Sequence, residues 1–339
     1  MWFDRAAGLA MFPGNIFRRW LLIFAPLPIL SASWGVTHWT RGGQASSPEG
    51  NHVVAAPIER RVTRRVAYQA DTDAAQAKLL AAACAERGED MKRQLGDDCS
   101  VIVRPPFVVA GDATTETLDV WYKQTIAPAA QGMAKSYFKI APDEPITILL
   151  FANETSYNHY AKRLFGDEGI SIYGYYRRHL RTLVMNISTG GGTLVHELTH
   201  ALMGFDFPEV PDWFNEGLAS LHEQCRFRDD GSGIDGLLNW RLPQLQQSIQ
   251  NGKVLPLREL ARRRDFRTRD VPLNYAMARY LCLFLQERKL LERYYREFRA
   301  NIKTDPTGEK TLLALFPDYS WSKLDGEYRA WALKLRREE

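Results

Sequence analysis

The sequence contains few cysteines and little net charge, and these shortages exclude several classes of protein. Its 339 residues include four cysteines, and none of them form a C-x-x-C pair, so neither a cysteine zinc site nor a thioredoxin-like redox site is expected. Lys and Arg number 44 against 40 Asp and Glu, a surplus too small to predict nucleic-acid binding. With 45% hydrophobic and 12% aromatic residues, the chain is predicted to fold around a sizeable core.

The first 40 residues differ in composition from the rest of the chain. An Arg-Arg pair precedes an uncharged run from residue 20 to residue 36. This pattern predicts a secretory signal at residues 1–33 or an uncleaved membrane anchor at residues 18–36, with a buried globular segment as the remaining alternative. Residues 34–57 are rich in Gly, Ser and Pro and predict a flexible linker. The protein is therefore expected to be exported, periplasmic or extracellular, or tethered to the membrane.

Three of the cysteines can be interpreted from their surroundings. In an exported protein, Cys84 and Cys99 could form a disulfide. Cys282 lies in the apolar run YLCLFL and is expected to be a buried small hydrophobic residue.

The pattern of residues 58–339 predicts an α+β fold, with a mixed β-sheet part at 58–188 followed by a mostly helical part at 189–339. After Asn186 the chain is expected to be helical to its end. The elements expected before that point are a helix at 71–94, β-rich runs at 100–111 and 145–152, a helix at 114–137, a helix between Asn153 and Gly166, and a hairpin of strands 171–176 and 181–188.

A glycine loop at residues 190–192 leads into the sequence TLVHELTHALM, which contains the motif H-E-x-x-H. His196 and His200 are one helical turn apart, so both imidazoles can reach one metal ion. Glu197 lies beside them, close enough to accept a proton from a metal-bound water. The alternative is a helix whose histidines share this spacing by chance.

A catalytic zinc site needs three protein ligands and an open position for water. Glu216, in the sequence PDWFNEGLASLHE, follows His200 after room for a loop and the start of a second helix. Asp206 competes with it, because it has the spacing of a metzincin's third ligand. The glycine that a metzincin places three residues after the second histidine is Met203 here, so Glu216 is favoured.

The pattern His196-Glu197-x-x-His200 with Asn215-Glu216-Gly217-x-Ala219 resembles the gluzincins, in particular the peptidase MA-like families. The resemblance implies a zincin-like fold in which a Zn²⁺ ion is held by His196, His200 and Glu216. It also implies that Glu197 is the catalytic base.

Two more residues receive roles from this resemblance. Glu223 occupies the place of an acidic residue that orients a zinc histidine, and it lies two turns beyond Glu216 on the same helical face; the alternative is an exposed helix glutamate. Tyr275, early in a later helix, matches the donor that stabilises the oxyanion. Tyr280 and His222 are further candidates for that donor, and ordinary packing is the alternative role for the tyrosines.

The sequence also departs from two gluzincin patterns. Ser220 stands where thermolysin-like enzymes have an aspartate. The Gly-x-Met-x-Asn strand of aminopeptidases is absent, so an endopeptidase is expected. The strand before the zinc helix is predicted to pair with an extended substrate, the alternative being an ordinary sheet strand. The residues proposed for that role are Leu183, Val184, Met185 and Asn186.

These features predict an exported zinc metallopeptidase acting on a peptide or protein substrate, with no nucleic-acid partner. The alternatives are a catalytically inactive zinc-binding module for partner binding and a structural envelope protein in which the motif is accidental. The arginine-rich segment 257–270 is expected to be a solvated helix face, the alternative being a surface that attracts anionic lipid or acidic substrate.

Overall fold

A long helix and a β-hairpin begin the part of the chain that the structure describes. The computed structural model describes residues 58–336, with side chains from residue 74 onward. Helix α1 (Ile58–Leu95) leads into strands β1 (Ser100–Arg104) and β2 (Phe107–Gly111). The predicted signal, anchor and linker lie outside the described residues. Within those residues, no helix has a stretch long and apolar enough to span a bilayer.

Five strands form a mixed sheet in the order β1-β2-β3-β5-β4. Strand β3 (Ile146–Phe151) pairs in parallel with β2 on one side and with β5 (Thr182–Asn186) on the other. Strand β4 (Gly174–Arg177) is antiparallel to β5 and forms one edge. The continuous apolar run of β3 is fully buried, as expected for a central strand covered on both faces. The fold is therefore mixed α and β, as the sequence pattern predicts.

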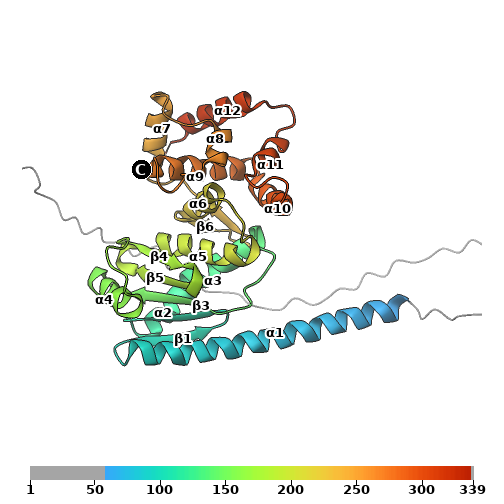
Figure 1. Cartoon of the computed structure of the whole chain (residues 1–339). Coiled ribbons are helices and arrows are strands. Elements are labelled where there is room, and N and C mark those ends of the chain that lie inside the picture. The colour runs from blue at the N-terminus through green and yellow to red at the C-terminus, as the bar shows by residue number, and fades with distance from the viewer. Residues whose placement is uncertain (1–57, 337–339) are drawn as a thin grey trace, which may run out of the picture. The chain divides into compact units, whose positions relative to one another are not determined.

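Helices cover both faces of this sheet (Figure 1). Alternate residues of β2 point to opposite faces: Val108 and Ala110 pack with α1 and α4 (Glu154–Phe165), whereas Phe107 and Val109 pack into the second, larger core. That larger core also includes α2 (Thr115–Trp121), a π-helical turn (Tyr122–Ile126) and α3 (Ala127–Ser136). The helix predicted for 114–137 is thus present with a π-turn inside it.

The limits predicted for helix α4 are confirmed by its caps. The Asn153 side chain accepts a hydrogen bond of 3.0 Å from the backbone N of Ser156, and the two residues form a capping box. At the other end Gly166 has a φ of 71°, the left-handed conformation that glycine adopts without strain.

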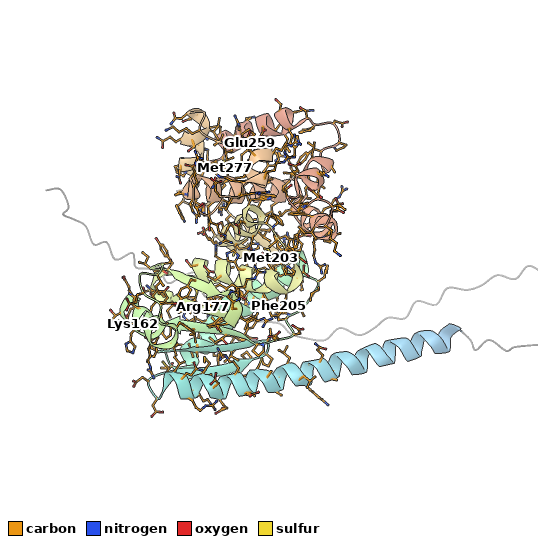
Figure 2. All side chains as sticks on the ribbon, in the orientation of Figure 1. Lys162, Arg177, Met203, Phe205, Glu259 and Met277 are labelled. Carbon is orange, nitrogen blue, oxygen red and sulfur yellow. The ribbon has the colours of Figure 1, made fainter. Side chains whose placement is uncertain are left out.

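The second half of the chain is helical apart from one small hairpin. Met203 of α5 and Met277 of α9 lie fully buried in its packing (Figure 2). The prediction of helix to the end is wrong at β6 (Cys225–Phe227) and β7 (Ile234–Gly236), because three-residue strands are too short to show a period. The helices are α5 (Gly191–Asp206), α6 (Asp212–His222), α7 (Leu242–Gln250), α8 (Leu257–Arg262), α9 (Val271–Glu287), α10 (Leu291–Asn301), α11 (Glu309–Ala314) and α12 (Trp321–Lys334).

The disulfide considered for Cys84 and Cys99 does not form. Both thiols are free. Cys84 is buried between α1 and the sheet, while Cys99 interacts with the Tyr160 hydroxyl instead. Cys282 is fully buried in α9, as predicted.

Candidate metal centre

Helix α5 carries both histidines of the motif, and its first turn lies against the end of α6. Gly190, the residue before the helix, has a φ of 98°. At Gly192 a Cβ would lie 2.4 Å from the carbonyl oxygen of Glu223. Only glycine allows such an approach, and it places Glu223 next to His196.

Helix α6 carries Glu216 and packs closely on α9. A Cβ added at Gly217 would lie 2.9 Å from the carbonyl oxygen of Ala278 in α9, so the two backbones touch at this point. The indole N–H of Trp213 donates to the carbonyl oxygen of Thr307 at 2.9 Å. These contacts hold Glu216 in the interior, where it is only 1% exposed.

The three predicted ligands converge with the spacing that a metal ion requires. His196 Nε2 lies 3.0 Å from His200 Nε2 and 3.4 Å from Glu216 Oε2. His200 Nε2 lies 3.5 Å from Glu216 Oε1. Ligand atoms about 2.0–2.1 Å from a tetrahedral ion lie about 3.3–3.4 Å apart. The cluster His196, His200 and Glu216 could therefore hold a metal ion.

The buried carboxylate of Glu216 also fits the role of a metal ligand. Neither of its oxygens has an aligned hydrogen bond within the described part of the chain. Arg267 Nη1 lies 2.6 Å from Oε1, which makes an ion pair without hydrogen-bond alignment. A buried carboxylate left in this state is costly, and a metal ion between Glu216 and the imidazoles would compensate it.

Each histidine is oriented through its second ring nitrogen. His200 Nδ1 lies 2.9 Å from Asn215 Oδ1, and because an amide oxygen only accepts, Nδ1 carries the proton and Nε2 keeps its lone pair. His196 Nδ1 lies 3.2 Å from Glu223 Oε1. These two atoms are not aligned for a hydrogen bond, and their contact is an ion pair when the imidazole is protonated. Glu223 therefore lies at the position predicted for a carboxylate that orients His196.

Electrostatics couples these groups strongly. Burial by itself would lower the pKa of His196, but Glu216 and Glu223 outweigh it and raise that pKa to about 10. Burial would raise the pKa of Glu216, but the imidazoles of His200 and His196 outweigh it and hold that pKa well below the usual range. The protonated imidazole of His196 thus supplies a positive charge beside two carboxylates. A bound metal cation would supply that positive charge in place of the proton.

The cluster forms part of the wall of a cavity of about 340 Å³. Glu197 lines the same cavity, so the proposed base reaches the space next to the ligands. The other polar side chains that line it are Tyr175, Tyr176, Arg178, Asn215, Arg267 and Tyr275.

Of the three candidate oxyanion donors, Tyr275 is the one that lines this cavity. Burial raises its pKa, and the neighbouring Glu216 raises it further, so the phenol keeps its proton. Tyr280 is fully buried and its hydroxyl interacts with the backbone of Asn239. His222 is fully buried, with Nδ1 3.1 Å from Thr199 Oγ1. Neither Tyr280 nor His222 lines the cavity, because each lies on a face of its helix that points away from it.

The prediction that residues 183–186 pair with substrate is wrong. They belong to β5, which is hydrogen-bonded to β3 on one side and to β4 on the other, and all of its residues are buried. A strand with both edges paired cannot add another. Among the described strands β1 and β4 form the two edges of the sheet, and Tyr175 and Tyr176 of β4 line the cavity.

Asp206, the alternative third ligand, has a structural role. It is 2% exposed, and Oδ1 accepts hydrogen bonds of 2.7 Å from the backbone N–H groups of Lys139 and Ile140. Oδ2 accepts from the Tyr295 hydroxyl at 2.9 Å and lies 3.3 Å from Nε of Arg299. These partners occupy the carboxylate, so Glu216 is the better candidate for a third ligand.

The solvated helix face predicted for the segment 257–270 is confirmed only for helix α8, which exposes its arginines and ends at Arg262. In the loop that follows, Arg267 reaches the wall of the cavity, and its Nε donates to Asp212 at 2.8 Å. Arg263 pairs with Asp265 and Asp270. The contacts of Arg267 are distant in sequence, so no local pattern indicated them.

No protein-family model matches the sequence, and no curated protein matches it. The chemistry of the site is therefore inferred from its own residues.

Proposed function

We propose that the protein is a zinc-dependent metallopeptidase of the gluzincin type, with a zincin-like fold, acting as an endopeptidase on peptides or proteins. The observation that carries this proposal is the convergence of His196, His200 and Glu216 at the wall of a cavity that Glu197 also lines. Two imidazoles and one carboxylate are a ligand set typical of catalytic zinc, which keeps a further position for water or substrate.

The chain's own residues provide the remaining parts of a hydrolysis. Zinc in such a site supplies Lewis-acid polarisation of a carbonyl and lowers the pKa of water. Glu197 accepts the proton of the attacking water and passes it to the nitrogen of the leaving amine. Tyr275 donates a hydrogen bond to the carbonyl oxygen as negative charge develops on it.

The free edge of β4 is the proposed place for the substrate backbone. An extended peptide adds to an exposed sheet edge through main-chain hydrogen bonds, which gives affinity with little sequence preference. Tyr175 and Tyr176 of this strand line the cavity that contains the ligands. This strand takes the role that the sequence pattern assigned to β5.

We also propose that the protein is exported, with residues 1–33 as a signal or residues 18–36 as a membrane anchor. The basic pair, the uncharged run and the small residues near its end support this location.

The variant Glu197→Gln tests the catalytic proposal. It removes the base and leaves all three ligands in place, so zinc stoichiometry should stay unchanged while peptide hydrolysis falls by about 10²–10⁴-fold. A peptide library is digested with and without chelator, and products are identified by mass spectrometry. Zinc content is measured on the same preparations.

Glu297→Gln on the surface of α10 is a matched control, because among the described side chains it pairs only with Arg293, and it should leave both readouts unchanged. Hydrolysis by Glu197→Gln at the wild-type rate would contradict the mechanism. Stoichiometric zinc with no turnover by the wild type would favour the inactive zinc-binding module instead.

A further inference from the structure

Arg241 contacts the carboxylate that orients His196. It lies between β7 and α7, and its side chain is 12% exposed. Nη2 donates to Glu223 Oε1 at 2.8 Å and Nε donates to Oε2 at 3.3 Å. Two donors from one guanidinium to both oxygens fix the orientation of a carboxylate as well as its charge.

Aromatic rings hold this guanidinium in place. Its carbon lies 4.1 Å from the centre of the Trp240 ring and 5.6 Å from the centre of the Tyr275 ring, which are cation–π distances. Tyr275 also lines the cavity. Arg241 therefore contacts Glu223, which orients a proposed metal ligand, and also Tyr275, which lines the cavity.

Hydrogen bonds within the protein anchor the loop that carries Arg241. The backbone N of Arg241 donates to Asn239 Oδ1 at 3.0 Å, and Asn239 Nδ2 donates to Glu223 Oε2 at 3.4 Å. Asn239 is 3% exposed, and its backbone interacts with the Tyr280 hydroxyl of α9. Groups held in this way need little rearrangement to act on a neighbour.

We propose that Arg241 is a positioning residue of the metal centre, which fixes Glu223 so that Glu223 orients His196. The Arg241 guanidinium holds both oxygens of the Glu223 carboxylate, and one of these oxygens lies 3.2 Å from His196 Nδ1. The inference depends on the metal site of the proposed function and does not depend on peptide hydrolysis.

The test measures Zn²⁺ affinity by competition with a chromophoric chelator. Arg241→Gln should weaken zinc binding by about 10–100-fold, the usual effect of removing an outer partner of a metal ligand. Arg241→Lys keeps the charge without the two-point contact, so its loss should be smaller. If Arg241 acts through Glu223, the double variant Arg241→Gln with Glu223→Gln should bind zinc as weakly as Glu223→Gln alone.

Arg228→Gln is the matched control, because Arg228 makes a similar two-donor contact with Asp235 but lies outside the cavity. Its zinc affinity should equal that of the wild type. Wild-type affinity in Arg241→Gln would overturn the inference, and so would losses that add in the double variant. Circular dichroism shows whether Arg241→Gln is folded. If it is not, the zinc affinity of Arg241→Lys compared with that of the wild type tests the inference. Loss of hydrolysis in Glu197→Gln is read separately, so the two proposals can fail independently.

Discussion

His222 should make the protein sensitive to mild acid. The Thr199 hydroxyl donates to the carbonyl oxygen of Val195 at 2.8 Å, so it accepts from His222 Nδ1. The other nitrogen, Nε2, is buried without a hydrogen-bond partner among the described residues. The imidazole is therefore neutral, and a second proton would place an unpaired charge in the core.

The size of the effect follows from proton linkage. Burial lowers the pKa of His222 to about 3, with His196 and Arg279 adding repulsion. Because the unfolded chain takes up this proton near its ordinary pKa of about 6.5, acid favours unfolding, and stability falls as the pH drops from about 6.5 towards about 3. Between pH 7.5 and pH 5.0 the loss from this one residue is about 2 kcal/mol.

The measurement compares urea unfolding of the wild type and of His222→Asn at both pH values, with chelator present. The asparagine amide keeps a donor for Thr199 and does not titrate. The smaller side chain lowers stability at both pH values, and that cost cancels in the comparison. Other titrating groups are shared, so they cancel as well. The wild type should therefore lose about 2 kcal/mol more than the variant on acidification.

Equal losses in the two proteins, within about 0.5 kcal/mol, would refute the reasoning. That result would mean that His222 is hydrated or takes up its proton near the ordinary pKa while folded.

Two further substitutions test the framework around the cluster. Asp206→Asn should lower the free energy of unfolding by about 3–5 kcal/mol, because it removes the charge of a buried network. Its zinc stoichiometry should stay at the wild-type value. Loss of zinc from this variant would show that Asp206 is a ligand after all. Gly217→Ala should lower stability by about 1–3 kcal/mol, because the added methyl group meets the α9 backbone. It should also weaken zinc binding, since Glu216 is the preceding residue. Gly326→Ala in α12, where nothing lies within 4 Å of an added Cβ, is the control. It lies outside the cavity and should leave zinc binding unchanged, while stability rises by about 0.5–1 kcal/mol because alanine favours a helix.

Helix and strand periodicity already separates some of the candidate site residues from one another. On a helix, seven residues bring Glu223 back to the face of Glu216, whereas six residues place His222 about 120° away from it. Tyr275 and Tyr280 are five positions apart, which likewise separates them by about 140°, so at most one of these two tyrosines could face the site. The uninterrupted apolar run of β5 indicated an internal strand rather than an edge.

Other features had no local signal. Arg241 and Arg267 reach the cluster from loops far along the chain from the residues they contact. Their positions depend on how α7, α8 and α9 pack, and an arginine in a loop has the same local pattern whether it faces solvent or a buried carboxylate. The hairpin β6–β7 was missed because its strands are short.

The sequence by itself determined the candidate ligand set, because helix geometry converts the spacing of His196 and His200 directly into a shared face, and the residues around Glu216 form a short, recognisable motif. It also determined helix α4, whose caps are local. Only the tertiary structure decided which strand has a free edge, that Asp206 is occupied by other partners, and that Arg241 braces Glu223. These depend on contacts between distant segments, and the geometry of such contacts is set by packing of the whole core rather than by the period of any one element.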